Sequence, residues 1–339
     1  MTLLREIHRN ITSQKKEEAV PTTNIISTVV LLVTFLFGLV VNNLYLWVTG
    51  FKMPKNINTT WFFHLILSNI VFTLTMPLVA IYMLTFPHWV FGSFLCKLIN
   101  VMISLGMYTN VFFLTIIGLD RYTLVYHPVW YRGHMNRRYA SALCIFFWGL
   151  GILCSSPYFA FRQVRLLDDN KTVICYNDYT ISAKPGNESS AIQIKWFMFG
   201  FRLLASFLLP FFVIAFCHIK IGLRMKNGNL SRSSKPYKIL FITVISFFIS
   251  YLPYHLWYGM SIKDSRFHKT FLDALKVIAM CLACFHYCFT PILYLLIAEK
   301  FKTVFRKSVL SLIESVLNEI FSTWNRGYEE NTCIDVNAN

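Results

Sequence analysis

Seven long apolar segments constrain the fold of this chain more than any other feature. Each is about as long as the 20 residues that an α-helix needs to cross a bilayer, or longer. Strands of a membrane barrel would be about ten residues long and would alternate apolar with polar side chains, so the segments indicate helices. The sequence predicts an all-α membrane protein, a seven-transmembrane helix bundle. The segments are residues 24–50, 60–84, 98–119, 139–161, 196–221, 239–262 and 277–298.

The composition excludes the common alternatives. Only 14% of the 339 residues are charged, whereas a soluble domain carries about 25%. No polar stretch of the sequence is long enough for an ordinary soluble domain of about 100 residues, so an appended enzyme domain is excluded. The net charge of +16 would suggest nucleic acid in a soluble protein. In a membrane protein it favours anionic membrane lipids and a cytoplasmic partner, and no nucleic acid.

A short amphipathic helix is predicted after the seventh segment. Phe301, Val304 and Phe305 recur at helical spacing among basic residues, which is typical of a helix on the inner membrane surface. The sequence thus divides into an extracellular N-terminal tail, a seven-transmembrane domain, an amphipathic helix and a cytoplasmic tail. These parts are residues 1–24, 25–298, 299–310 and 311–339.

The orientation follows from the connectors. A modest excess of Lys and Arg on one side favours an extracellular N-terminus. Three Asn-x-Ser/Thr sequons, at Asn10, Asn170 and Asn187, then fall outside and are candidate glycosylation sites.

The cysteines and histidines do not predict a metal or cofactor. Six of the nine cysteines lie inside apolar segments, where a thiol usually packs as a small apolar group. Cys281 and Cys284 form a C-x-x-C pattern, but no basic neighbour lowers a thiol pKa there. Cys96 and Cys175 differ, because each lies in a polar connector on the same predicted side. The histidines show no zinc-binding spacing, so we expect no metal and no cofactor.

Polar residues and prolines recur at one or two per segment. Polar groups in hydrocarbon are costly, so each is a functional candidate. Asp120, Arg121 and Tyr122 stand at the inner end of the third segment. A proline frees a carbonyl and kinks a helix, although single prolines are tolerated in any bundle. The prolines inside segments are Pro77, Pro157, Pro210, Pro253 and Pro291.

In combination these residues resemble the rhodopsin-like (class A) G-protein-coupled receptors across essentially the whole chain. The stretches 89–97 and 127–130 look like the chemoattractant-receptor branch, which includes the formyl-peptide, chemerin and anaphylatoxin receptors. The matching positions are Asn42, Asn69, Cys96, Asp120, Arg121, Tyr122, Trp148, Cys175, Pro210, Pro253, Pro291 and Tyr294.

The resemblance implies a function and partners. The chain would be a plasma-membrane receptor for an extracellular peptide or lipid acid, coupled to a heterotrimeric G protein of the inhibitory class and also recognised by arrestin. It implies a Cys96–Cys175 disulfide and a coupling role for Asp120, Arg121 and Tyr122, with Arg121 paired to Asp120 at rest. No Asp or Glu occurs in residues 223–238, so an ionic lock from Arg121 to the sixth helix cannot form through that segment.

The resemblance also implies activation switches, and four positions depart from it. The sixth helix would swing about Pro253 between two states. Asn69 replaces an aspartate, so the interior sodium site of the family loses its carboxylate and we expect no strong site, with Asn110, His286 and Thr290 as neutral neighbours. His218 replaces a tyrosine, Tyr251 a tryptophan, and Thr290 an Asn or Asp. The switch positions are Asn69, Phe247, Tyr251, Pro253, Thr290, Pro291 and Tyr294.

The departures leave three functions open. The first is a ligand-activated receptor with other switches. The second is a scavenger or pseudo-receptor that binds ligand without productive coupling. The third, a transporter or channel, is disfavoured because charges are almost absent from the segments and no internal repeat is visible.

Arg202 is the formally charged residue that lies well inside a segment. A cation there costs about 2.5–3.5 kcal/mol on insertion scales unless it finds a partner. Its fork binds a carboxylate in a bidentate way, and the resemblance implies a basic residue here that meets an acidic group of the ligand. We therefore predict a ligand site at Arg202, with Tyr108, Tyr254 and His255 as neighbours. The alternative is an arginine that snorkels to the outer headgroups.

Overall fold

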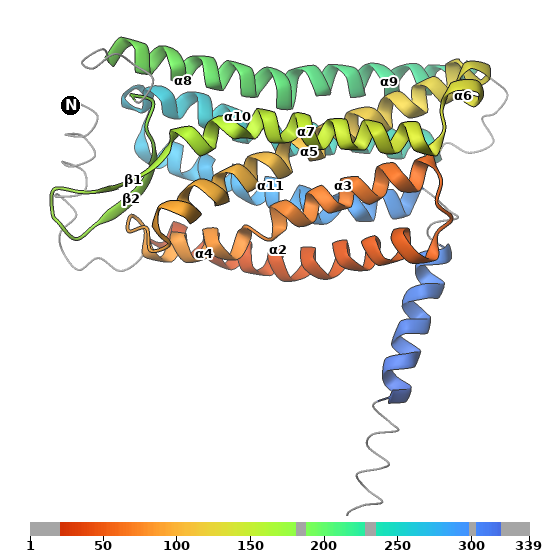
Figure 1. The fold of residues 1–339 in the computed structure, drawn as a ribbon, viewed down its shortest axis with the longest axis horizontal. Helices are drawn as coiled ribbons and strands as arrows, with labels where there is room; N and C mark the ends of the chain where they lie inside the picture. The colour runs from red at the N-terminus through yellow and green to blue at the C-terminus, as the bar shows by residue number, and fades with distance from the viewer. Residues whose placement is uncertain (1–20, 181–187, 228–234, 298–302, 320–339) are drawn as a thin grey trace, which may run out of the picture.

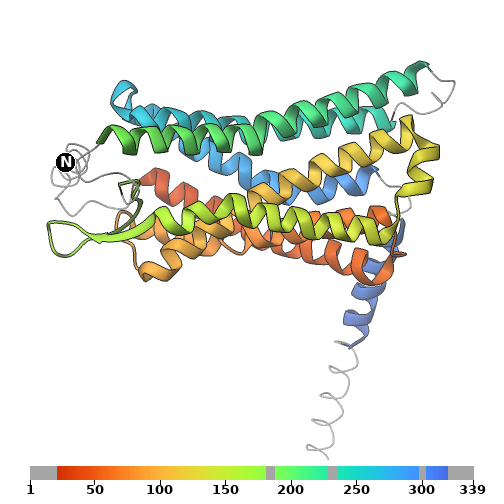
Figure 2. The same cartoon turned by 45° about the horizontal axis from the view of Figure 1, so that its top comes forward.

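The computed structural model describes residues 21–180, 188–227, 235–297 and 303–319. Its long helices lie side by side in one bundle (Figures 1 and 2), which confirms the predicted fold class. Six helical segments of this part are long and apolar enough to cross a membrane, and α10 completes the seven. The bundle helices are α2 (Thr22–Trp47), α3 (Ile57–Thr73), α4 (Met76–Thr85), α5 (Gly92–Tyr126), α7 (Arg137–Phe161), α8 (Glu188–Leu203), α9 (Leu209–Asn227), α10 (Lys235–Met260) and α11 (Lys269–Ile297).

The helices extend beyond the apolar segments. The third segment was predicted over 98–119, but α5 holds 35 residues and therefore spans about 52 Å at 1.5 Å per residue. A bilayer core is only about 30 Å thick, so both ends of α5 project into polar surroundings. Helical hydrogen bonds continue there because they do not depend on an apolar solvent. Hydropathy thus located the helices but underestimated their length.

The prolines act at each predicted position, but in different ways. Pro77 lies in the first turn of α4, just after the break that separates α4 from α3. Pro210 follows a π-helical turn, η2 (Leu204–Leu208), which joins α8 to α9. Because proline has no N–H, the carbonyl four residues earlier loses its partner and the turn can widen. Pro157, Pro253 and Pro291 lie inside continuous helices.

A β-hairpin lies at one end of the bundle, where the sequence predicted only a polar connector. Strands β1 (Arg162–Leu166) and β2 (Val173–Asn177) pair antiparallel, with Val164 opposite Cys175. Asn170 takes a positive φ of 53° in the turn, a conformation that asparagine tolerates. We call this end of the molecule the disulfide end, for the reason given below.

The opposite end, the Asp120 end, carries two short helices. Helix α6 (Pro128–His134) follows α5 directly. A helix of residues 303–319 leaves the bundle and runs across the direction of the other helices (Figures 1 and 2). Val304 and Phe305 pack against the core, and the ring of Phe305 lies 6.5 Å from that of Tyr45. The helix thus reaches residue 319 rather than the predicted 310, while Phe301 lies outside the described residues.

Helix α5 forms the centre of the core and packs against α3, α7 and α9. Its buried face includes Tyr108, Val111 and Phe113. The approach of α5 to α3 needs a glycine, because a Cβ on Gly106 would lie 2.9 Å from the Cβ of Phe72. Close backbone contact lets polar side chains of neighbouring helices meet inside the bundle. Two such polar clusters form the candidate site.

Candidate functional site

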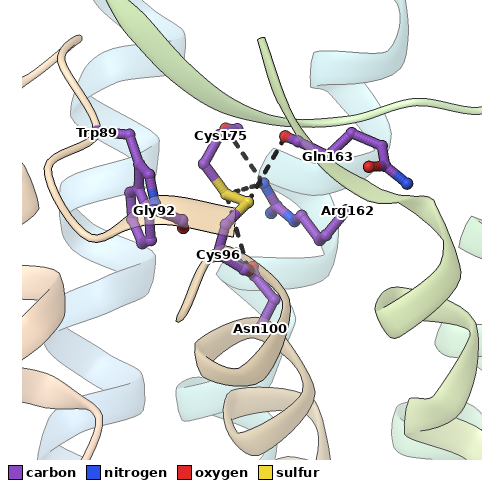
Figure 3. Close-up of a disulfide and its surroundings, with 7 residues drawn as sticks. All are labelled: Trp89, Gly92, Cys96, Asn100, Arg162, Gln163 and Cys175. Carbon is purple, nitrogen blue, oxygen red and sulfur yellow. Dashed lines mark hydrogen bonds between the residues drawn. A yellow bond between two sulfur atoms is a disulfide. The ribbon is translucent and has the colours of Figure 1, made fainter. Parts of the chain in front are cut away.

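The disulfide end is fixed by covalent and hydrogen bonds (Figure 3). Cys96 at the start of α5 and Cys175 on β2 form a disulfide with a Cα–Cα distance of 5.8 Å, which confirms the predicted pair. The backbone N–H of Trp89 donates to the carbonyl of Val173 at 2.7 Å, and its indole donates to the carbonyl of Gly92 at 2.8 Å. Gly92 has a φ of 72°, a conformation that glycine adopts without strain. The hairpin is thereby held across the end of the bundle.

Arg162 extends from the hairpin toward the disulfide (Figure 3). A terminal nitrogen donates to the carbonyl of Cys175 at 3.5 Å, and Nε is buried without a partner among the described residues. Arg162 was not among the residues predicted from the sequence. The sequence shows only that a cation follows directly after the fourth apolar segment. The direction of the Arg162 side chain toward the bundle depends on the pairing of β1 with β2.

Arg202, at the end of α8, points into the bundle. Its side chain is only 4% exposed, so the snorkelling alternative is wrong. The guanidinium carbon lies 5.0 Å from the ring centre of Tyr158, 5.1 Å from Tyr254 and 5.5 Å from Tyr258. Cation–π contacts of this kind stabilise a desolvated cation. We call Arg202, Tyr158, Tyr254, Tyr258 and Ser104 the Arg202 cage.

The cage leaves the hydrogen-bonding capacity of Arg202 incomplete. One terminal nitrogen donates to the hydroxyl of Ser104 at 3.3 Å, while Nε has no partner in the described structure. No carboxylate of the described residues forms an ion pair with Arg202. Guanidinium carries five N–H donors, so the side chain retains donors for an anion. A buried cation without a counter-ion is unusual and is a feature of functional sites.

The predicted neighbours of Arg202 lie around it. Tyr254 belongs to the cage, and Tyr108 of α5 is close enough to interact electrostatically with the guanidinium. His255 faces the hydroxyl of Ser206 at 3.5 Å, and that hydroxyl donates to the carbonyl of Arg202 at 2.7 Å. His255 Nδ1 is buried and unpartnered within the described residues.

Three members of the cage, Tyr158, Tyr258 and Ser104, were not among the predicted residues. Tyr258 follows Tyr254 by four residues, a spacing that places both on one helix face and could have been read from the sequence. Tyr158 carried no such signal, because it comes from a helix that is distant in sequence. The hydroxyl of Tyr258 lies 3.4 Å from that of Tyr179, next to β2, so the cage is connected to the hairpin.

A second cluster of polar side chains lies between α2, α3, α5, α10 and α11. Asn110 donates to Asn69 at 2.6 Å, and Asn69 donates to Asn42 at 3.2 Å. Asn42 in turn donates to the carbonyls of Gly38 and Tyr287. We call Asn42, Asn69, Asn110, Tyr251, His286 and Tyr287 the asparagine network.

The asparagine network contains no carboxylate. The hydroxyl of Tyr251 lies 3.1 Å from Asn110 Oδ1 and 3.2 Å from the hydroxyl of Tyr287. Because it carries one proton and the amide oxygen can only accept, it donates to Asn110 and accepts from Tyr287. His286 Nε2 lies 3.3 Å from the same oxygen of Asn110. Thr290 donates to the carbonyl of His286 at 2.6 Å. The predicted neutral neighbours of Asn69 are thus gathered here, with Tyr251 as an addition. In the described chain, no group of His, Cys, Asp and Glu has the arrangement of a metal site.

The Asp120 end differs from the prediction. Asp120 is 4% exposed, and its Oδ1 accepts from the indole of Trp61 at 3.1 Å and from the hydroxyl of Tyr131 at 2.8 Å. Burial and the bond to Asp120 raise the pKa of Tyr131, so this hydroxyl stays protonated and donates. The structure shows no ion pair between Asp120 and Arg121 among the described residues. The expected resting pair is replaced by two neutral donors, because α6 folds back against α5 and brings Tyr131 to the carboxylate.

The remaining predicted residues are placed as follows. Tyr122 stacks on Tyr126 with ring centres 4.8 Å apart, and Phe247 lies 4.9 Å from Tyr251. Buried His218 has no partner for Nδ1 within the described residues. The side chain of Tyr294 lies outside the described part of the structure.

Of the three sequons, the structure describes one. Asn170 is exposed in the turn of the hairpin, at the disulfide end. Asn10 and Asn187 lie outside the described residues.

Comparison with known proteins agrees with this arrangement. Residues 41–294 match the family described as 7 transmembrane receptor (rhodopsin family). The chain is 39% identical over 302 residues to a human protein named probable G-protein coupled receptor 33, covering 88% of this chain and 90% of that one. It is 31% identical over 298 residues to the C3a anaphylatoxin chemotactic receptor of Oncorhynchus mykiss (87% and 80%). It is 30% identical over 316 residues to chemerin-like receptor 1 of Rattus norvegicus (89% and 84%).

Proposed function

Because the chain belongs to the rhodopsin family of seven-transmembrane receptors, and within it to the chemoattractant-receptor branch, we propose that it detects an extracellular ligand carrying a carboxylate and signals through an inhibitory heterotrimeric G protein. The family consists of multi-pass receptors of the plasma membrane rather than enzymes. Membership of this family establishes that the chain is a seven-transmembrane receptor. The ligand chemistry, the G-protein class and the orientation are proposals.

The observation that carries the ligand proposal is the Arg202 cage. A cation is buried there among aromatic rings with an unpaired donor and without a carboxylate partner in the described structure. A ligand carboxylate can take two parallel hydrogen bonds from a guanidinium, which repays the desolvation of both groups. Arg162, the first residue of β1, also has an unpaired Nε in the described structure and can meet a second acceptor of the ligand.

The class of ligand follows from this charge and from the relatives. The similar proteins include receptors whose names state an anaphylatoxin or a chemerin-like specificity. A peptide that inserts its C-terminal carboxylate, or a lipid acid with its single carboxylate, would satisfy Arg202. Tyr108, Tyr254 and His255 supply an aromatic wall with hydroxyl and ring-nitrogen hydrogen-bonding groups.

The orientation is argued from the disulfide. Disulfides persist in oxidising surroundings, and the Asn170 sequon is exposed at the same end of the molecule. We therefore assign the disulfide end and the N-terminal tail to the outside of the cell. The Asp120 end then faces the cytoplasm, with residues 303–319 along the inner membrane surface and residues 320–339 as the tail. Arg121 and Tyr122 would contact the G protein, and arrestin would dock at the same end.

A double-mutant cycle between receptor and ligand tests the proposal. A panel of formylated peptides, anaphylatoxin-like C-termini and lipid acids is screened for suppression of cyclic AMP. For the ligand found, Arg202→Ala should lower the affinity at least tenfold, because it removes a bidentate charged pair. Amidation of the ligand acid should cause a similar loss with wild type and little loss with Arg202→Ala. Arg202→Lys is the matched control, because it keeps the charge without the fork.

The outcomes separate the candidate functions. Additive losses in the cycle would contradict the Arg202–carboxylate pair. Arg121→Ala should reach the surface and bind ligand but stay silent. Ligand binding by wild type with no effect on cyclic AMP would instead indicate the pseudo-receptor.

A further inference from the structure

A groove of about 560 Å³ lies at the Asp120 end of the bundle, away from the Arg202 cage. It is bordered by α2, by the π-helical turn η1 (Val48–Lys52) that follows it, and by the first two turns of α3 and of α7. Its aromatic walls are Trp47, Phe51 and Phe63. The receptor function proposed above does not use this groove.

The groove has an apolar wall and a basic mouth. Lys55 precedes α3, and Arg137 is the first residue of α7, and both line the opening with exposed side chains. Lys52 adds a third cation, since its Nζ lies 5.2 Å from the ring centre of Trp47. The lining residues, all of them described, include no Asp or Glu. This charge distribution is complementary to an anion and leaves none of the three cations with an acidic partner in the groove.

His64 adds a neutral donor to the wall. The indole N–H of Trp148 donates to His64 Nδ1 at 3.2 Å, and because indole nitrogen only donates, Nδ1 must be the acceptor. The proton of the neutral ring therefore lies on Nε2, which has no hydrogen-bond partner within the described part of the chain. The ring stacks on Phe113 with centres 5.8 Å apart, so its orientation is fixed. An occupant with oxygen acceptors would use this donor.

The groove lies on the lipid-facing side of the molecule. The outer face of α2 exposes Val33 (60%), Leu36 (63%) and Val40 (58%), and Phe51 at the groove is 82% exposed. Apolar exposure on this scale indicates contact with acyl chains, and cations at the end of such a face lie at headgroup level. A soluble anion would not use the aromatic wall, and an uncharged sterol would not use the cations. Both parts of the groove fit an amphiphile with an anionic head.

We propose that this groove binds an anionic phospholipid, with its phosphate between Lys55 and Arg137 and one acyl chain between Trp47 and Phe63. The assignment of this lipid to the inner leaflet rests on the orientation proposed above, whereas the binding itself does not.

Native mass spectrometry of the full chain in detergent tests the proposal without ligand or G protein, so its failure is distinguishable from failure of the receptor function. Dioleoyl phosphatidylserine should bind about tenfold more tightly than dioleoyl phosphatidylcholine, since two basic residues meet the extra charge. Lys55→Gln combined with Arg137→Gln should abolish this preference. Arg132→Gln combined with Arg138→Gln removes two exposed cations at the same end that do not line the groove, and should preserve it.

Ser141→Phe provides an independent variant, because it narrows the groove and keeps both cations. It should weaken binding of both phospholipids, and it remains informative if the double charge variant does not fold. The proposal is overturned if wild type does not distinguish the two lipids, or if the control pair loses the preference as fully as Lys55 and Arg137 do. It is equally overturned if glycerophosphoserine without acyl chains binds as well, or if cholesterol displaces phosphatidylserine regardless of the two cations.

Discussion

The Arg202 cage and the asparagine network bury polar groups in the same bundle in opposite ways. In the cage, a charged guanidinium faces three aromatic rings and keeps an unpaired Nε in the described structure. In the network, neutral amides and hydroxyls pair with one another in a chain from Asn42 to Tyr251. The first cluster is a cation with donors left for an external partner, whereas the second pairs neutral groups with one another and, among the described residues, leaves Nδ1 of His286 without a partner.

This difference suggests that the Arg202 cage serves ligand recognition and that the asparagine network serves the stability of the bundle. A buried charge without a carboxylate partner costs folding free energy because it is desolvated, and this cost is offset when an anion pairs with it. A network of neutral groups that pair with one another stabilises the packed state and specifies one arrangement of the helices. Substitutions in the two clusters should therefore affect different measurements.

The largest effect is expected from opening the disulfide, because it removes the hairpin from the cage but does not touch the network. Loss of a native disulfide typically costs about 2–5 kcal/mol, so Cys175→Ala should abolish surface expression or ligand binding. Surface level is measured by antibody labelling of intact cells. Cys281→Ala is the control, because Cys281 is a free thiol in α11, and it should behave as wild type. Normal surface expression and ligand binding of Cys175→Ala would show that the Arg202 cage does not need the disulfide-anchored hairpin.

The next largest effect is a loss of thermal stability on substitution in the asparagine network, which is compared with a substitution in the Arg202 cage. Asn110→Leu leaves Asn69, Tyr251 and His286 with lost hydrogen bonds in the interior. Unsatisfied buried groups cost about 1–3 kcal/mol each, so the thermal midpoint of the ligand-free receptor should fall by several degrees. Differential scanning fluorimetry in detergent measures this midpoint.

Arg202→Met is the matched substitution in the cage. It replaces a buried charge by an apolar chain of similar length, which is often neutral or stabilising, so the midpoint should stay level or rise. Equal losses in Asn110→Leu and Arg202→Met would mean that the cage is structural, and the contrast between the clusters would fail.

The smallest effect concerns sodium, and it tests whether the network is truly uncharged. Exchange of sodium for an impermeant cation at fixed ionic strength should leave the wild-type midpoint and ligand affinity unchanged, because Asn69 offers no carboxylate. Asn69→Asp should introduce a sodium dependence. A clear sodium response of the wild type would require a carboxylate that the described network lacks.

Local sequence patterns predicted the parts of the site that depend on chain-local physics. Each of the seven apolar segments folds as helix, although the second is divided between α3 and α4 and the fifth between α8 and α9. Each proline lies at a break, at a π-turn or inside a helix. Arg202 stood out because a charge among apolar residues is visible without any structure. The family resemblance then supplied the Cys96–Cys175 pair and the approach of Asn69 to Asn110.

Only the tertiary structure decided which distant side chains meet. Asp120 was expected to form an ion pair with Arg121, but its carboxylate instead accepts hydrogen bonds from Trp61 and Tyr131. The packing of α3 and α6 against α5 brings these two donors to the carboxylate. Arg162 points toward the bundle only because β1 pairs with β2. The length of an apolar segment depends only on consecutive residues, so it can be read from the sequence whatever the fold. The partners of a buried polar group are set by how helices pack, and no local pattern encodes that.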